Sequence, residues 1–460
     1  MGPATWDGHP RCLLASAGMW QAKHGSQTKC PIRPRSRGVP CRRPRPVRWV
    51  AGESPDEPSN SHGRSEPHVS CPPADPTRTA APASGAWRPG DDAGDRLFHT
   101  VVDGRSFQLE GGGSLRHLEV AYETWGTLDD TASNAVLVCH ALTGDSHAAG
   151  RAGPGHPAPG WWDALIGPGK ALDTDHLFIV CANVLGGCQG TTGPSSIDPS
   201  TGRPYGPRFP VVSIRDMVRT QASMAGALGI RRWRAVVGGS MGGMQALEWA
   251  VMYPDRVDAL VLASSTAQAS AQQIAWSLIG RTAIQNDPAF RDGEYYDAGP
   301  GDGPHRGLSL ARMTAQVTYR SDQVFTERFG RTVLRPLEFT EGPLFDVEGY
   351  LEYHGDKLVR RFDANSYLRL NRAMDLHDVG RGRGGVANAL ARVRCPTLIA
   401  SVDSDSLYPP GQQLELHQGL IAGGQRSTWI DIHSPHGHDG FLIETGQLAP
   451  RITEFLRETA

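Results

Sequence analysis

Five short, almost uninterrupted apolar runs most strongly constrain how this chain folds. They are AVLVCHAL, LFIVCANVLG, RAVVGGS, VDALVLASS and CPTLIASVDSD, which begin at residues 135, 177, 234, 257 and 395. Strands covered by helices on both faces have this continuous apolar character, whereas half-exposed strands alternate. Segments between the runs, such as RDMVRTQASMAGALGI, have helical spacing. The alternation predicts an α/β fold with a mostly parallel central sheet.

The alternation stops between residues 266 and 390. Segments such as AQQIAWSLIGRTAIQ are helical in spacing there, and no strand-like run interrupts them before Cys395. An insertion of this length between two strands is typical of a lid over one edge of a sheet. We therefore predict a core in two parts, residues 96–265 and 391–460, with a helical lid over residues 266–390.

The chain begins with a segment of different composition, residues 1–95. It holds 15 of the 35 prolines, and its first fifty residues carry ten Lys or Arg and one acidic residue. Without a periodic apolar pattern, such a segment cannot offset its ordering entropy by burial. We predict that it is a disordered basic tail.

Composition also limits the possible partners. The remainder of the chain is mildly acidic, so nucleic acid is not expected as the main partner. No apolar stretch is long enough for a membrane helix, and no secretory signal is evident, so we predict a cytoplasmic protein without membrane contact. The eight cysteines lack the paired spacings of a zinc site, and no metal site is predicted.

The stretch GGSMG, residues 238–242, fits the pattern GxSxG. In a nucleophile elbow the serine occupies a strained turn between a strand and a helix, where flanking side chains would collide. Here a strand-like run precedes the motif and a helix-like run follows it. This context predicts that Ser240 is a nucleophile, with the amides of Met241 and Leu142 as its oxyanion hole.

A serine hydroxyl needs a base and a group that orients the base. In α/β-hydrolase folds the acid comes next along the chain and the histidine last. The residues alone leave two acids and three histidines open: Asp403, Asp405, His433, His436 and His438.

Further blocks in the chain add a more specific signal. They include HALTGDSHAAG, ANVLGGCQGTTGPSS, VVGGSMGGMQALEWA, VTYRSD, YLEYHGDKLVRRFDANSYL, HDVGRGRGG, SDSLYP and HGHDGFLIE. From about residue 97 to 457 the chain resembles the homoserine O-acetyltransferase family, α/β-hydrolase-fold acyltransferases of methionine biosynthesis. The resemblance implies transfer of the acetyl group of acetyl-CoA to the hydroxyl of L-homoserine through a ping-pong acyl-serine intermediate. It also implies a homodimer and no permanently bound cofactor, with acetyl-CoA as a substrate.

The resemblance also assigns site residues. It makes Ser240 the nucleophile, Asp405 the acid and His438 the base. Arg320 and Asp439 are implied to hold the amino acid substrate. The additional histidine at position 436 departs from the family pattern.

Alternatives remain within and outside this class. A relative could use succinyl-CoA as donor or serine as acceptor, or the same triad could serve an esterase or thioester hydrolase. A binding scaffold with a vestigial elbow is a non-enzymatic alternative. The basic segments HGDKLVRRF and HDVGRGRGG could contact CoA phosphates or form solvated edges of the lid.

Overall fold

An eight-stranded sheet forms the centre of the computed structural model, which describes residues 79–334, 342 and 344–459. Its strand order is β1-β2-β4-β3-β7-β8-β9-β10. The strands are β1 (Leu97–Gln108), β2 (Ser114–Trp125), β3 (Ala135–Cys139), β4 (Phe178–Ala182), β7 (Ala235–Gly239), β8 (Leu260–Ala263), β9 (Thr397–Val402) and β10 (Ser427–Ile432). All neighbours from β4 to β10 are parallel, whereas the pairs β1–β2 and β2–β4 are antiparallel, so β2 runs opposite to the other strands. The predicted α/β fold with a mostly parallel sheet is confirmed.

The central strands β3, β4, β7, β8 and β9 are buried on both faces, which explains the continuous apolar runs. Val236 of β7 joins one hydrophobic cluster with Trp249, and its neighbour Val237 joins a second cluster with Leu448 and Phe455. Successive side chains of a strand point to opposite faces. A strand that contributes to two clusters therefore needs an apolar residue at every position.

Helices cover the sheet and also fill the segment between β8 and β9. The core helices are α1 (Ile214–Ala227), α2 (Met241–Met252), α9 (Pro410–Ala422), α10 (Gly440–Ile443) and α11 (Thr445–Glu458). The short elements are β5 (Ile197–Asp198), β6 (Arg203–Pro204), η1 (Gly206–Arg208), η2 (Pro254–Arg256), η3 (Pro288–Gly293) and η4 (Gly437–Asp439). Within the described ranges, no helix combines the length and apolar character needed to cross a bilayer.

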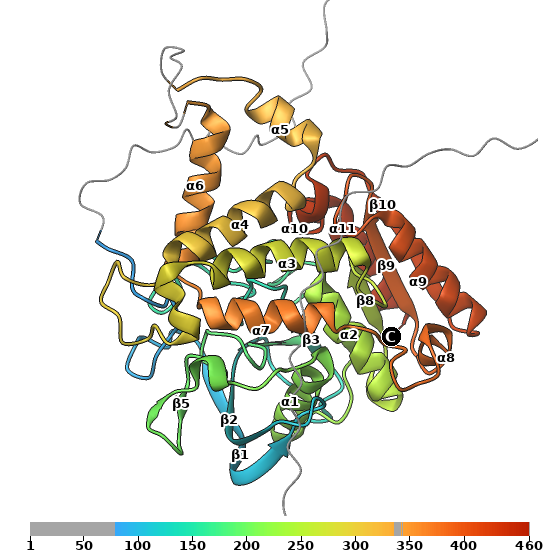
Figure 1. The fold of residues 1–460 in the computed structure, drawn as a ribbon. Helices are drawn as coiled ribbons and strands as arrows, with labels where there is room; N and C mark the ends of the chain where they lie inside the picture. The colour runs from blue at the N-terminus through green and yellow to red at the C-terminus, as the bar shows by residue number, and fades with distance from the viewer. Residues whose placement is uncertain (1–78, 335–341, 343, 460) are drawn as a thin grey trace, which may run out of the picture. The chain divides into compact units, whose positions relative to one another are not determined.

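The segment between β8 and β9 contains six of the described helices and is called the insertion. They are α3 (Ala271–Gln285), α4 (His305–Tyr319), α5 (Asp322–Arg328), α6 (Asp346–Val359), α7 (Ala364–Asp375) and α8 (Val386–Leu390). The insertion is coloured yellow to orange in Figure 1. Within it, α3 packs against α4 and α7, and α4 packs against α6. The C-terminal end of α4 also contacts η4, which follows β10. The insertion therefore reaches the end of the sheet where the parallel strands terminate.

The prediction of a disordered tail is wrong for residues 79–95, while residues 1–78 lie outside the described part of the chain. Ser84 Oγ donates a hydrogen bond to Asp363 Oδ1 at 2.8 Å, and the amides of Gly85 and Trp87 donate to backbone carbonyls of the folded body. Several small side chains of this segment, such as Ala86, are buried. Backbone hydrogen bonding orders the segment, and such bonding leaves no periodic signal in a sequence rich in Ala, Pro and Gly.

The turn between β7 and α2 is unusually close-packed. Ser240 adopts φ 56° and ψ −125°, a conformation that non-glycine residues rarely occupy. A Cβ atom on Gly242 would lie 2.0 Å from the Cys139 carbonyl oxygen, and one on Gly238 would lie 2.2 Å from the Gly242 carbonyl oxygen. Both contacts are to backbone, so the chain cannot relieve them by rotating a side chain.

We expect Gly242→Ala to lower the free energy of unfolding by about 3 kcal/mol, the upper end of the range for overpacking, because the added methyl group would meet backbone atoms that cannot move aside. Urea unfolding followed by circular dichroism measures the change.

Gly226→Ala is the matched control. Gly226 lies exposed in α1, and a Cβ there would meet nothing within 4 Å. Alanine in a helix is favoured over glycine by up to about 1 kcal/mol, so this variant should be neutral or more stable. Equal stability of the two variants would contradict the tight turn.

Candidate active site

Ser240, His438 and Asp405 meet at the carboxyl ends of β7, β10 and β9, which lie in the same half of the sheet. His438 Nε2 lies 2.9 Å from Ser240 Oγ, and His438 Nδ1 lies 2.7 Å from Asp405 Oδ2. Ser240 follows β7, Asp405 follows β9 and His438 lies in η4 after β10. All three are buried. Because an ionised carboxylate only accepts, Nδ1 carries the hydrogen and Nε2 is left to accept the serine proton.

The surroundings fix the orientation of both partners. Asp405 Oδ1 accepts hydrogen bonds from the amides of Leu407 at 2.9 Å and Tyr408 at 2.8 Å. The Tyr408 ring stacks on the His438 ring with centroids 4.8 Å apart. Phe441 contacts the same imidazole edge-on at 5.5 Å. Rigid partners of this kind hold an imidazole in one productive geometry.

The other candidate acid and histidines lie elsewhere. His433 Nδ1 pairs with Asp403 Oδ2 at 3.1 Å, in a separate contact whose side chains are 79% and 40% exposed. His436 Nδ1 lies 3.3 Å from Arg320 Nη1. Of the alternatives left open by the residues, the geometry therefore favours Asp405 and His438.

Two backbone amides beside Ser240 are available as donors. Met241 is the first residue of α2, where an amide has no partner within the helix. The Leu142 amide donates to no other residue in the described part of the chain. Gln245 Nε2 links the two segments, since it donates to the carbonyls of His140 at 3.1 Å and Met241 at 3.2 Å. The Gln245 side chain thus connects the segment that carries the Leu142 amide with the helix that carries the Met241 amide.

His140 has a structural role in the same loop. Its Nε2 accepts the Val184 amide at 3.1 Å, so Nδ1 carries the hydrogen and donates to the Ala141 carbonyl at 2.8 Å. Burial lowers the pKa of His140. The neutral ring connects the ends of β3 and β4.

Arg320 and Asp439, the two predicted substrate residues, contact each other. Arg320 Nε lies 3.3 Å from Asp439 Oδ2, and the side chains are 12% and 19% exposed. Arg320 directly follows α4 of the insertion, whereas Asp439 directly follows His438. A cation and an anion therefore lie next to the candidate base.

A cavity of about 50 Å³ lies between the insertion and the core, and two residues of its lining, Tyr319 and Tyr408, contact the His438 ring. Its lining includes Leu142, Leu407, Tyr408, Tyr319 and Tyr367. None of the described lining residues is charged. The cavity can hold a small uncharged group.

A cluster of cations lies within the insertion around His354. Burial, together with the charges of four neighbouring cations, lowers the pKa of His354 to about 3; the cations are Arg312, Lys357, Arg320 and Arg328. The Arg312 guanidinium also lies 5.5 Å from the centroid of the Tyr319 ring, which is 5.7 Å from the His438 ring. Among the described acidic residues, none forms an ion pair with Arg312 or Lys357.

The arginines of HDVGRGRGG have partners instead. Arg381 pairs with Glu110 at 3.0 Å, and Arg383 pairs with the buried Glu248 at 2.8 Å. Both arginines of this segment are therefore ion-paired, and Arg381 also remains partly exposed. Of the two basic segments, only HGDKLVRRF contributes a cation, Lys357, that has no carboxylate partner in the described ranges.

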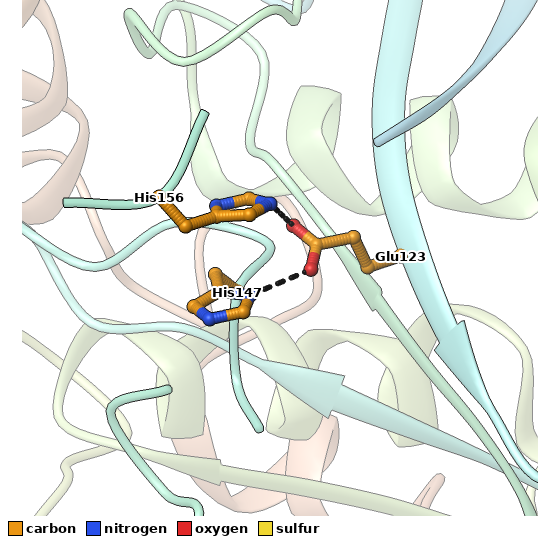
Figure 2. A group of neighbouring side chains, drawn as sticks. All are labelled: Glu123, His147 and His156. Atoms are coloured by element: carbon orange, nitrogen blue, oxygen red, sulfur yellow. Dashed lines mark hydrogen bonds and ion pairs between the residues drawn. The ribbon is translucent and has the colours of Figure 1, made fainter. Parts of the chain in front are cut away.

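Glu123, His147 and His156 form a buried group that the sequence did not predict (Figure 2). Their residue types suit a metal ion, but the carboxylate already accepts Ser146 Oγ at 2.7 Å and pairs with His147 Nδ1 at 2.8 Å. Arg96 supplies further positive charge beside Glu123. Hydrogen-bond donors and the Arg96 guanidinium thus already balance the charge of the Glu123 carboxylate. We therefore interpret the group as a hydrogen-bonded network.

Comparison with known proteins identifies the family. Residues 134–438 match the family model of the alpha/beta hydrolase fold. The homoserine O-acetyltransferase of Thermobifida fusca is 53% identical over 83% of this chain and 99% of its own length, and that of Clavibacter michiganensis is 52% identical over 82% and 96%.

Solved structures agree with this relationship. The homoserine O-acetyltransferase from Bacillus anthracis has a TM-score of 0.73 and 29% identity, covering 78% of this chain and 97% of that one. Esterase E22 has a TM-score of 0.72 and 32% identity, covering 78% and 99%. The family resemblance predicted from the sequence is confirmed: this chain belongs to the homoserine O-acetyltransferase family, within the alpha/beta hydrolase fold.

Proposed function

We propose that this protein transfers the acetyl group of acetyl-CoA to the side-chain hydroxyl of L-homoserine, a step of methionine biosynthesis, through an acetyl-Ser240 intermediate. The observation that carries the proposal is the unbroken contact from Asp405 through His438 to Ser240, with the Arg320–Asp439 pair beside it. The relatives named homoserine O-acetyltransferase supply the substrate class.

In the first half-reaction, His438 Nε2 takes the proton of Ser240 as Oγ attacks the thioester carbonyl carbon. The Met241 and Leu142 amides donate to the developing oxyanion. When the tetrahedral intermediate collapses, the carbon–sulfur bond breaks and the proton on His438 passes to the sulfur of CoA. Ser240 is left as an acetyl ester.

In the second half-reaction, the homoserine hydroxyl occupies the position that the sulfur has left. His438 takes its proton, the hydroxyl oxygen attacks the ester carbonyl, and the same two amides donate to the oxyanion. The bond to Ser240 Oγ then breaks, and His438 returns the proton to the serine. Catalysis by a positioned base of this kind contributes about 10²- to 10⁴-fold.

Arg320 and Asp439 suit the two charges of an amino acid. The guanidinium can bind the carboxylate with two parallel hydrogen bonds, and Asp439 can accept from the ammonium group. Each hydrogen bond to a charged group contributes about 1.5–3 kcal/mol. Their pairing in the free protein keeps both side chains beside His438 until the substrate replaces the contact.

The uncharged cavity supports acetyl rather than succinyl as the transferred group. Its 50 Å³ is roughly three to five times the ~10–15 Å³ that one water needs. A succinyl group would bring a second carboxylate, and an unpaired charge is costly to bury. The described lining offers no cation to pair with it.

Arg312 and Lys357 suit the phosphates of CoA. Burial lowers the pKa of Lys357, as do the neighbouring Arg361 and Arg312, so the site would gain from an anion. The position of Arg312 against Tyr319 is compatible with a donor that enters past α4 towards His438.

Hydrolysis is the second candidate function, because structural relatives include esterase E22. Burial of Ser240 and His438 beneath the insertion favours transfer, since water must be kept from the acetyl ester.

The predicted homodimer remains part of the proposal. Four apolar side chains are exposed on α3 and α4 and offer a surface for a second copy of the chain: Leu278, Ile279, Leu310 and Val317.

Incubation with acetyl-CoA should add one acetyl group to Ser240, and L-homoserine should then remove it. Mass spectrometry of the intact protein and its peptides measures both steps. Asp405→Asn should slow acylation by about 10³- to 10⁴-fold, because the imidazole loses the tautomer that accepts the serine proton.

Two variants control this experiment. Ser240→Ala should take up no acetyl group, and Asp403→Asn should acylate as fast as the wild-type protein. A protein that remains unlabelled by acetyl-CoA, or one in which Asp403 matters more than Asp405, would contradict the proposal.

Arg320→Gln should separate transfer from hydrolysis. We expect acylation by acetyl-CoA to be unchanged and the homoserine-dependent release of acetyl to fall by about 10- to 100-fold, because the carboxylate loses its charged partner. Release should be followed at several homoserine concentrations by rapid quenching. An esterase would show the same slow, homoserine-independent release in both proteins.

Lys357→Ala and Arg312→Ala should each raise the KM for acetyl-CoA by about 3- to 30-fold and leave the KM for homoserine unchanged, because each removes one phosphate partner. Steady-state kinetics with both substrates measures the change. Arg381→Ala is the control, since Arg381 is paired with Glu110. If Arg381→Ala raises the KM for acetyl-CoA and the other two variants do not, the CoA phosphates bind HDVGRGRGG instead, and the assignment of Arg312 and Lys357 is wrong.

A further inference from the structure

The loop that follows β3, residues 140–149, is held by side chains from outside it. This loop carries Leu142, whose amide is one of the two proposed oxyanion donors. Loops are usually more mobile than the elements they connect. An oxyanion donor must nevertheless be fixed before the charge develops, because its value lies in preorganisation. The contacts of loop 140–149 therefore bear directly on the reaction.

The first set of contacts comes from the sheet. Glu123, at the end of β2, accepts from Ser146 Oγ at 2.7 Å through Oε1 and pairs with His147 Nδ1 at 2.8 Å through Oε2. Asn183 Oδ1, directly after β4, accepts the Ser146 amide at 3.0 Å. Glu123 and Ser146 are almost completely buried. One carboxylate thus binds two consecutive residues of the loop.

A second histidine closes the network around Glu123. The His156 ring stacks on His147 with centroids 3.9 Å apart, and its Nε2 lies 3.6 Å from Glu123 Oε1 (Figure 2). Figure 2 shows both rings directed at the same carboxylate. The stack limits rotation of His147 and keeps its Nδ1 on Glu123.

The second set of contacts comes from the insertion. Arg361, which follows α6, donates from Nη1 to the Thr143 carbonyl at 2.8 Å and from Nη2 to Asp145 Oδ2 at 2.7 Å. Thr143 is the residue after Leu142. The planar guanidinium holds two points of the loop in one fixed spacing.

We propose that Glu123 and Arg361 are positioning residues that together fix loop 140–149, so that the Leu142 amide faces the acyl oxygen at Ser240. The inference rests on the proposed function, because it assumes the oxyanion role of Leu142. Neither side chain touches the reacting atoms. Since Arg361 belongs to the insertion, docking of the insertion also sets the geometry of the oxyanion hole.

The test compares Glu123→Gln and Arg361→Gln with the wild-type protein. Acylation by acetyl-CoA and discharge by homoserine are timed by rapid quenching, and rates are expressed per Ser240 that can be acylated. We expect both steps to slow by a similar factor of about 10- to 100-fold, less than the 10²- to 10³-fold loss of a whole oxyanion donor. The KM for homoserine should stay unchanged, and Arg361→Lys should restore part of the rate.

Controls separate positioning from general damage. Glu119→Gln alters another acidic residue of β2, which makes no side-chain hydrogen bond to loop 140–149 in the described structure, and should keep wild-type rates. If Glu123→Gln does not fold, Ser146→Ala removes the same contact with a smaller change. A merely structural role would reduce the fraction of Ser240 that can be acylated and leave the rate per site unchanged, which would overturn the inference.

The double variant Glu123→Gln/Arg361→Gln adds an independent measurement. Residues that act through one loop are non-additive, so its rate should fall by less than the product of the single effects. If the wild-type protein acylates but the double variant loses the full product of the two single effects, joint action of Glu123 and Arg361 is refuted. The proposed function would stand in that case. Failure of the wild-type protein to acylate would instead refute the proposed function.

Discussion

A backbone contact too close for any side chain underlies the whole site. The α carbon of Gly242 faces the carbonyl of Cys139 so closely that a Cβ would lie 2.0 Å from the oxygen. This contact binds α2 to the end of β3 and leaves Ser240 in its strained turn, with Met241 at the free end of the helix. The strain is tolerated because β3, β7 and β8 form a rigid, fully buried part of the sheet.

The remaining parts of the site come from distant segments that the parallel sheet brings to one edge. The proposed acid, Asp405, follows β9 and the proposed base, His438, follows β10, so adjacent strands bring these two side chains into contact. The insertion contributes Arg320, the cations around His354 and much of the uncharged cavity. The core thus supplies the chemistry of acyl transfer, and the insertion supplies most of the groups proposed to choose the substrates.

Sequence reasoning predicted the features that depend on local pattern. The apolar runs located β3, β4, β7, β8 and β9, and the glycines around Ser240 predicted the turn. The pattern could not choose between Asp403 and Asp405, since both follow one strand and only packing against His438 distinguishes them. Order in residues 79–95 and the network of Glu123 with His147 and His156 depend on contacts between separate segments. Such contacts leave no trace in spacing or composition.

The position of the insertion within the sheet has a broader consequence. It leaves after β8 and returns before β9, two strands that are hydrogen-bonded neighbours. The insertion can therefore change in length or sequence without breaking the hydrogen bonds between the strands that carry the proposed catalytic residues. Changes confined to the insertion can therefore alter which molecule accepts the acyl group. Descendants of one ancestral core could in this way come to include both transferases and esterases.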